Sequence, residues 1–203
     1  MLANASNLLM MMREPTATPV LSLEDGSIFE VRPVTPDDKS LLASGFERLS
    51  ERSRYLRFLG AMPALSRRQL AYLSELDHRN HVAIGVLHDG EPVAVGRWVR
   101  FEDEPSDADV AITVIDDYQG RGVGRIVVEV LAMVARHRDV RWLHFDVLGE
   151  NTPMLRLLDR LGAVRTPSGP VIHAVLDADT VSAPVGVVGD LLGLVDDAAR
   201  RAS

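Results

Sequence analysis

The sequence predicts an α/β (α+β) domain in which helices flank one sheet of about six to seven strands. Three observations support this prediction. Helical patterns precede the long apolar segments, two neighbouring apolar segments are separated by a short turn, and later a strand, a glycine-rich turn and a helix follow one another. A chain of 203 residues can bury a sizeable core and suits one domain.

The composition is typical of a folded globular protein, with 46% apolar and 25% charged residues. The sequence holds no cysteine, which excludes disulfides, thiolate nucleophiles and cysteine-based zinc sites and fits a reducing, cytoplasmic location. The apolar run from Leu8 to Met12 is too short to span a bilayer and lacks a basic start, so we expect neither export nor a membrane partner. The formal net charge of -7 argues against a nucleic-acid partner.

Both ends of the chain are expected to lie outside the main domain, which is expected over residues 26–178. Residues 1–25 show no helical or alternating period, which indicates a flexible N-terminal tail. Residues 179–203 are expected to form a C-terminal tail in which a helix would place Leu191, Leu192 and Val195 on one side. That apolar side would pack either on the domain or on a second copy of the chain, as a homodimer.

Within the domain, apolar periods predict the elements in order. A first strand is expected over Ser27–Val34, and Thr35 and Pro36 then start a helix that continues to about Leu49, because Thr35 can accept a backbone N–H and proline suits the first helical position. A later helix is expected over Ser66–Leu76. The other expected elements are a helix over 53–58, an antiparallel hairpin over 82–99, strands over 110–115 and 142–148, helices over 124–137 and 151–161, and short strands near 163–165 and 171–176.

The segment from Gln119 to Arg125 is expected to bind phosphate groups. Three glycines in five positions follow a strand and open a helix, which leaves backbone N–H groups bare where the helix dipole favours anions. A glycine turn kept only for tightness is the alternative. Arg125 stands where the dinucleotide fingerprint needs glycine, and the Lys of the Walker motif is missing, so neither of these phosphate motifs fits.

Gln119, Gly122 and Gly124 fill the pattern Gln/Arg-x-x-Gly-x-Gly/Ala. With this pattern and the order of its elements, the chain resembles the general amino-group N-acetyltransferase (GNAT) superfamily over roughly residues 28–176. The resemblance implies a GNAT-type mixed, mostly antiparallel sheet whose central parallel strands splay apart. It also implies acetyl-CoA as the co-substrate.

The resemblance implies how acetyl-CoA would be held. Backbone amides of the glycine turn would cradle the pyrophosphate, and the strand before the turn would line the pantetheine arm and the acetyl group. The residues implied in cofactor binding are Ile112, Thr113, Val114, Gln119, Gly120, Arg121, Gly122, Val123, Gly124, Arg125 and Asn151. Asn151 matches an asparagine that contacts the pantetheine arm in the family, and it would equally serve as a helix N-cap without any ligand.

Asp109 is the candidate catalytic base, because an alkylammonium must lose a proton before it can attack a thioester. Alternation along the strand places it on the side of Thr113. This segment resembles the acetyltransferase domain of bacterial protein-lysine acetyltransferases, some of which carry a cyclic-nucleotide-binding domain, and there the matching residue is a glutamate. Aspartate is one methylene shorter, so a water would bridge it to the amine. A solvent-exposed acid without a catalytic role is the alternative, and His144 and Asp146 are other candidate bases.

A second segment resembles the same subgroup and favours lysine acetylation. The frame Leu-Ser-x-x-Ser-x-Tyr-x-x-Phe is filled by residues 49–58, and its arginines would contact an acidic partner or a coenzyme phosphate, or form a solvated helix face. Many superfamily members use a tyrosine as general acid, but the matching position here is Leu158, which has no hydroxyl. His78, His81 and His88 have no acidic partner at ligand spacing, so no metal site is expected.

The sequence therefore predicts an acetyl-CoA-dependent N-acetyltransferase that moves an acetyl group to a primary amine, with a protein lysine favoured as the acceptor. Two alternatives remain. The chain would be an acetyl-CoA-binding sensor module without turnover, or it would acetylate a small-molecule amine.

Overall fold

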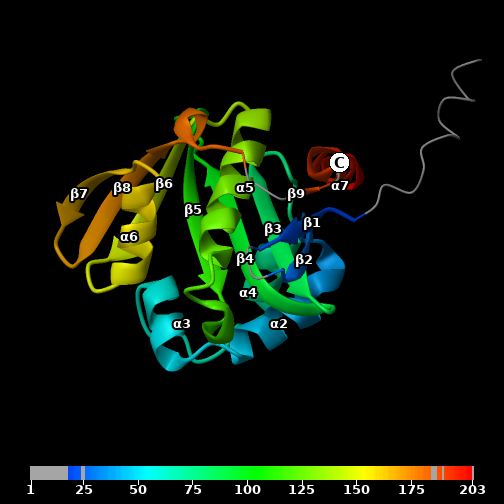
Figure 1. The fold of residues 1–203 in the computed structure, drawn as a ribbon, viewed down its shortest axis with the longest axis horizontal. Coiled ribbons are helices and arrows are strands. Elements are labelled where there is room, and N and C mark those ends of the chain that lie inside the picture. Colours follow the sequence, from blue (N-terminus) through cyan, green and yellow to red (C-terminus); the bar gives the residue numbers. More distant parts are fainter. Residues whose placement is uncertain (1–17, 24–25, 184–186, 189, 203) are drawn as a thin grey trace, which may run out of the picture.

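One sheet runs through the centre of the protein. The computed structural model describes residues 18–23, 26–183, 187–188 and 190–202, and Figure 1 shows their arrangement. The strands within these residues are β1 (Val20–Ser22), β2 (Ile28–Pro33), β3 (His81–His88), β4 (Glu91–Arg100), β5 (Asp107–Val114), β6 (Trp142–Leu148), β7 (Val164–Ser168), β8 (Val171–Asp177) and β9 (Val187–Val188). They form a nine-stranded sheet in the order β7-β8-β6-β5-β4-β3-β2-β1-β9. Only the pair β5 and β6 is parallel among the described strands.

Helices flank this sheet on both sides, as predicted (Figure 1). The α-helices are α2 (Lys39–Glu47), α3 (Glu51–Phe58), α4 (Arg67–Ser74), α5 (Val123–His137), α6 (Thr152–Arg160) and α7 (Leu191–Arg201). The 3-10 helices are η1 (Pro36–Asp38), η2 (Asp116–Tyr118) and η3 (Ala178–Thr180). The mixed, mostly antiparallel sheet is confirmed, and all seven expected strands are present.

The sequence missed β1 and β9, which have three and two residues and are too short to show an alternating pattern. Val20–Ser22 were expected in the flexible N-terminal tail, but they pair with β2. Residues 1–17 of that tail lie outside the described residues.

The first helical segment starts at Pro36 as predicted, and Thr35 and Asp38 form a capping box at this start. Asp38 Oδ2 accepts hydrogen bonds from the backbone N of Thr35 at 2.7 Å and from Thr35 Oγ1 at 3.1 Å. Arg32 also donates to both carboxylate oxygens of Asp38, at 2.8 and 2.7 Å. Burial disfavours the charge on Asp38, but these bonds outweigh it and the pKa of Asp38 is lowered.

Alternation along the strands gives the sheet two different faces. One face carries the main core, in which the fully buried Trp98, Leu143 and Phe145 pack with apolar residues of α5, α6 and α7. The opposite face carries a smaller cluster in which Leu42 of α2 packs against the sheet near Val95. The hydrophobic core therefore lies mostly on the α5 side, and polar groups occupy part of the α2 side.

β5 and β6 separate partway along their length. Residues 107–109 of β5 pair with residues 142–144 of β6, and no pairing between the described strands continues beyond this point. β5 stays paired with β4 as far as Val114, so β6 is the strand that diverges. The splayed parallel pair implied by the resemblance is confirmed. Asp109 is the last residue of β5 that pairs with β6 and therefore lies at the apex of the split.

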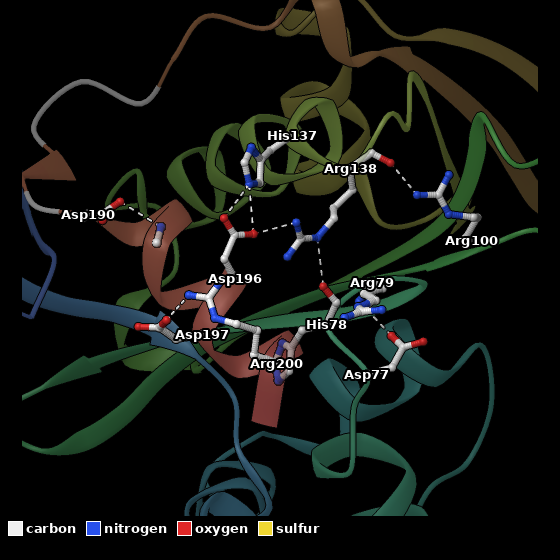
Figure 2. A network of polar contacts seen from close by, with 11 residues as sticks. Asp77, His78, Arg79, Arg100, His137, Arg138, Asp190, Asp196, Asp197 and Arg200 are labelled. Carbon is white, nitrogen blue, oxygen red and sulfur yellow. Dashed lines mark hydrogen bonds and ion pairs between the residues drawn. The ribbon is translucent and has the colours of Figure 1, made fainter. Parts of the chain in front are cut away.

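The C-terminal helix α7 packs on the same chain, with Leu191 and Val195 buried in the main core. Figure 2 shows the polar contacts that fix it to α5. Arg138 Nη1 donates to Asp196 Oδ1 at 2.7 Å, and His137 Nε2 lies 3.1 Å from the same oxygen. Of the two positions expected for the apolar side of this helix, the structure shows packing on its own domain.

No helix in the described part of the chain is long and apolar enough to cross a membrane.

Candidate active site

The glycine turn after β5 brings the open start of α5 next to the split. Gly120 and Gly122 have φ values of +74° and +92°, in the left-handed region that favours glycine. Within the described residues no side chain caps α5, whereas α3, α4, α6 and α7 each begin with a side-chain cap and α2, which has none, continues directly from η1. The first amides of α5 have no partner within the helix. This helix start therefore suits an anionic ligand.

Helix α3 is tied directly to this turn through Asp116. Ser50 donates to the carboxylate from its backbone N at 3.1 Å and from Oγ at 2.6 Å, and Ser53 Oγ donates at 2.9 Å. Gln119 Nε2 then donates to Ser53 Oγ at 3.2 Å and to the carbonyl of Val114 at 3.0 Å. The serines of the Leu-Ser-x-x-Ser frame therefore hold α3 against the glycine turn, which gives that sequence frame a structural reason.

These bonds predict how stability depends on pH. Burial disfavours the charge on Asp116, but the hydrogen bonds from Ser50 and Ser53 outweigh it, so the pKa of Asp116 is lowered. A lowered carboxyl pKa stabilises the folded state above the unfolded value of about 3.9. That stabilisation is lost as the pH falls through the folded pKa.

We therefore expect Asp116→Asn to lower the free energy of unfolding at pH 7 by about 1 kcal/mol, since the hydrogen bonds are exposed. Urea unfolding of both proteins between pH 2 and 7 measures the difference, which should shrink at the acid end. Asp117→Asn removes the neighbouring exposed acid and is the matched control. Equal losses in the two variants would contradict the assignment.

The side chains of the glycine turn are engaged by the protein itself. Val123 is fully buried, Arg121 lies over the ring of Tyr118 at 5.2 Å, and Arg125 Nε donates to the buried Glu129 at 2.7 Å. Any contact of this segment with a phosphate would therefore come from backbone amides more readily than from these side chains.

The strand residues implied in cofactor binding point to two different sides. Ile112 and Val114 face the α5 side, because a Cβ built on Gly124 would lie 3.8 and 3.7 Å from their side chains. These are ordinary contact distances, so alanine would also fit at residue 124, as the family pattern allows. Thr113 points to the opposite side, where its Oγ1 accepts a hydrogen bond from Arg57 Nε at 3.1 Å.

Asp109 shares the Thr113 side of β5, as alternation predicted. Its side chain is exposed, but nearby protein still removes enough water to raise its pKa. The positive charge of Arg97 opposes this shift, and the negative charge of Asp146 adds to it. A carboxylate with a raised pKa is a better proton acceptor than an ordinary one, which suits a catalytic base.

Arg57, Arg97 and Thr113 line a cavity of about 90 Å³, which lies on the α2 side of the sheet between the strands and α2. Burial lowers the pKa of Arg57 to about 10, with the positive charge of Arg97 as the second cause. The guanidinium of Arg97 lies 4.9 Å from the ring centre of Tyr72. The sequence did not single out Arg97, and it did not separate Arg57 from the other arginines of its helix.

The alternative bases His144 and Asp146 belong to a hydrogen-bonded chain across three strands. His144 Nε2 lies 2.6 Å from Asp107 Oδ1, and its Nδ1 lies 3.2 Å from His173 Nε2. His173 Nδ1 lies 2.9 Å from Asp146 Oδ1. Because His144 is the register partner of Asp109, this chain begins beside the apex of the split. His173 was not predicted as a site residue.

Two further positions have clear local roles. Asn151 Oδ1 accepts a hydrogen bond from the backbone N of Met154 at 3.3 Å, so Asn151 is an N-cap of α6. Its contact with a pantetheine arm stays a prediction. Leu158 is fully buried in the main core, so this position serves packing.

Two features together define the class of protein: a sheet split between its parallel strands, and an anion-suited helix start beside that split. The chain belongs to the acetyltransferase (GNAT) family, whose model matches residues 46–163.

Two named relatives share about a third of the sequence. Acetyltransferase Pat from Mycolicibacterium smegmatis is 34% identical over 190 residues, which cover 91% of this chain and 56% of the relative. The chain therefore spans little more than half the length of Pat. Acetyltransferase PA5475 from Pseudomonas aeruginosa is 33% identical over 162 residues, which cover 76% of this chain and 87% of the relative.

Solved structures agree with this family. The GNAT domain of S. lividans PAT has a TM-score of 0.75 at 31% identity, covering 80% of this chain and 96% of that domain. A cAMP-binding acyltransferase from Mycobacterium smegmatis has a TM-score of 0.62 at 30% identity, covering 97% of this chain and 59% of the relative. YncA from Salmonella typhimurium, solved with its cofactor acetyl-CoA, is 14% identical, covers 77% of this chain and 97% of that one, and has a TM-score of 0.62. At that identity the likeness shows the fold alone.

Proposed function

We propose that this protein is an acetyl-CoA-dependent N-acetyltransferase that transfers an acetyl group to a primary amine, with a protein lysine as the favoured acceptor. The observation that carries the proposal is the split between β5 and β6, with Asp109 at its apex and the uncapped start of α5 beside it. This arrangement supports a phosphate-bearing donor on one side of β5 and an acceptor on the other.

The donor is proposed to enter from the α5 side. The amides of residues 120–125 would hold the pyrophosphate, and the α5-facing residues Ile112 and Val114 would line the pantetheine arm. The open space around Gly120 and Gly122 supports this placement, since a Cβ built on either would meet no atom within 4 Å. The edge of β5 beyond Asp109, unpaired with β6, would leave backbone N–H groups near the thioester carbonyl, where they stabilise developing negative charge.

The acceptor amine is proposed to approach from the Asp109 side. Its lone pair attacks the thioester carbonyl carbon, a C–N bond forms, the C–S bond breaks, and the electron pair leaves on the sulfur of coenzyme A. Asp109 takes the proton that the amine loses, directly or through a water. The coenzyme A thiol resembles cysteine, with a pKa of about 8.5, so the thiolate can leave without a general acid. This chemistry is compatible with Leu158 at the tyrosine position.

The two arginines near Asp109 affect the acceptor as well. The positive charges of Arg57 and Arg97 act on Asp109. They would also favour the neutral form of an amine that approaches Asp109, which is the form that attacks. The frame at residues 49–58, similar to that of protein-lysine acetyltransferases, favours a lysine over a small-molecule amine.

Calorimetry with acetyl-CoA and an assay of thiol release test the proposal together. We expect binding of acetyl-CoA with micromolar affinity and thiol release that depends on a lysine-containing protein or peptide. Binding without release across proteins, peptides and small amines would support the sensor alternative. Release with small amines alone would support a small-molecule acetyltransferase, and absence of binding would contradict the proposal.

A further inference from the structure

Arg57 and Arg97 are unusual because both point inward and have no anionic partner. Among the described residues, neither guanidinium forms an ion pair, and Arg97 Nη1 is buried without a hydrogen-bond acceptor. The Nε of Arg57 donates to Thr113, which is a neutral acceptor. Two neighbouring cations in a dehydrated place are costly unless an anion joins them.

A third arginine of the same cavity, Arg32, does have a carboxylate partner within the protein. Arg32 also lines the cavity and is held by Asp38 through two bonds of 2.8 and 2.7 Å. The strand register places Arg32, Gly85, Val95 and Thr113 in one cross-strand row, so Arg32 lies three strands away from Thr113. The arginine on the β2 side therefore has its carboxylate within the fold, whereas the two on the β5 side lack one.

Asp109 only partly balances this charge. Its carboxylate attracts both arginines over distance, without an ion pair to either in the described structure. Asp146 also acts on Asp109, but its carboxylate contacts His173, and Asp109 is the acid that acts on Arg57, so the two guanidiniums keep an excess of positive charge. A ligand with its own carboxylate would complete the balance, and the planar forks of arginine match carboxylates well.

We propose that Arg57 and Arg97 form a carboxylate-binding subsite next to the reacting groups, so that the protein favours a transfer partner that carries a carboxylate. This inference rests on the proposed function. The carboxylate could belong to the acyl chain of the donor or to the acceptor beside its amine, and the chemistry at the arginines is the same. The cavity that both arginines line, about 90 Å³, gives room for a short acyl extension.

Two matched ligand pairs distinguish the sources. In the donor arm, succinyl-CoA is compared with butyryl-CoA, which has an acyl chain of equal length without the carboxylate, using one lysine peptide. In the acceptor arm, acetyl-CoA is used with two lysine peptides that differ only by Glu or Gln beside the lysine. We expect the carboxylate-bearing member of one pair to have a kcat/KM higher by about tenfold or more, as for one charge-assisted hydrogen bond.

Arg97→Met and Arg57→Met keep the apolar stem and remove the charge. We expect either substitution to reduce the preference within a pair to about one, and the ratio of kcat/KM between the two members is the readout because loss of either charge near Asp109 also changes the rate with both members. Arg68→Met removes an exposed arginine of α4 and is the matched control, which should keep the preference. Thermal unfolding checks that each variant is folded. If the arginines had only a structural role, each substitution would lower kcat/KM for both members of a pair by the same factor and leave the ratio of the two values unchanged.

Calorimetry with the same pairs separates this inference from the proposed function. Succinyl-CoA and butyryl-CoA are titrated alone, and the peptides are titrated in the presence of coenzyme A. A tenfold affinity difference that disappears in Arg97→Met supports the subsite even if no acyl transfer occurs. Equal affinities and equal rates within both pairs, or a preference that survives in both arginine variants, would overturn it.

Discussion

Replacing Asp109 with Asn is expected to lower kcat/KM for acetyl transfer by about 10²–10⁴-fold, the usual contribution of a general base. Asp109 lies at the apex of the split, and the loss of water around its carboxylate raises its pKa. The amide keeps the shape of the side chain but cannot accept the proton that the amine loses. Initial rates of thiol release with saturating acetyl-CoA and varied acceptor measure the effect.

The loss should not come from unfolding. A carboxyl whose pKa is raised in the folded state is less favourable as a charged group there than in the unfolded chain, so its ionisation at pH 7 costs stability. Asp109→Asn removes that charge. Its melting temperature is therefore expected to equal or exceed that of the unchanged protein, which makes activity and stability change in different directions.

The pH dependence gives an independent check on the same residue. The base must be ionised to act, so kcat/KM should fall as the pH drops through the raised pKa of Asp109, which lies above the ordinary carboxyl value of about 3.9. Asp109→Asn should lack this acid limb, and Asp109→Glu should retain it. Asp103→Asn removes an exposed loop acid and serves as the control. An unchanged acid limb in Asp109→Asn would contradict the role of Asp109 as the base. The hydrogen-bonded residues His144, His173 and Asp146 would then be the candidates for the base.

Local patterns predicted most of the fold because they are properties of single segments. The period of two in the hairpin strands and the helical period before them correspond to β3, β4, α2 and α4. The glycine turn was equally local, since its proposed function would depend on backbone amides of consecutive residues. β1 and β9 escaped prediction because two or three residues contain no period, and their place at the sheet edge depends on pairing with β2 and with each other.

The polar parts of the candidate site could not be predicted, because they depend on register between distant strands. His173 meets Asp146 only through the antiparallel pairing of β6 and β8, which a shift of one residue would destroy. Arg97 looked like an ordinary polar position in a hairpin strand, and four arginines around α3 looked alike. Only the fold distinguishes Arg57, which turns inward, from Arg52, which pairs with Glu150 at the surface.

Replacing Gly122 with Val is expected to raise the Kd for acetyl-CoA by about 100-fold, equivalent to losing two charge-assisted hydrogen bonds. Residue 122 is the N-cap of α5 and has a φ of +92°, which a β-branched residue adopts only with strain. Relief of that strain would move the amides that are proposed to hold the pyrophosphate. Calorimetry with acetyl-CoA measures the change.

Gly90→Val separates the loss of the ligand from the strain itself. Gly90 lies in the turn between β3 and β4 with a φ of +79°, and as at Gly122 a built Cβ meets no atom within 4 Å. Both substitutions therefore carry a similar backbone penalty and should lower the melting temperature by similar amounts. Only Gly122→Val should weaken binding, because only its amides face the proposed donor. If both variants bound acetyl-CoA like the unchanged protein, the glycine turn would serve tightness alone and the donor would be held elsewhere.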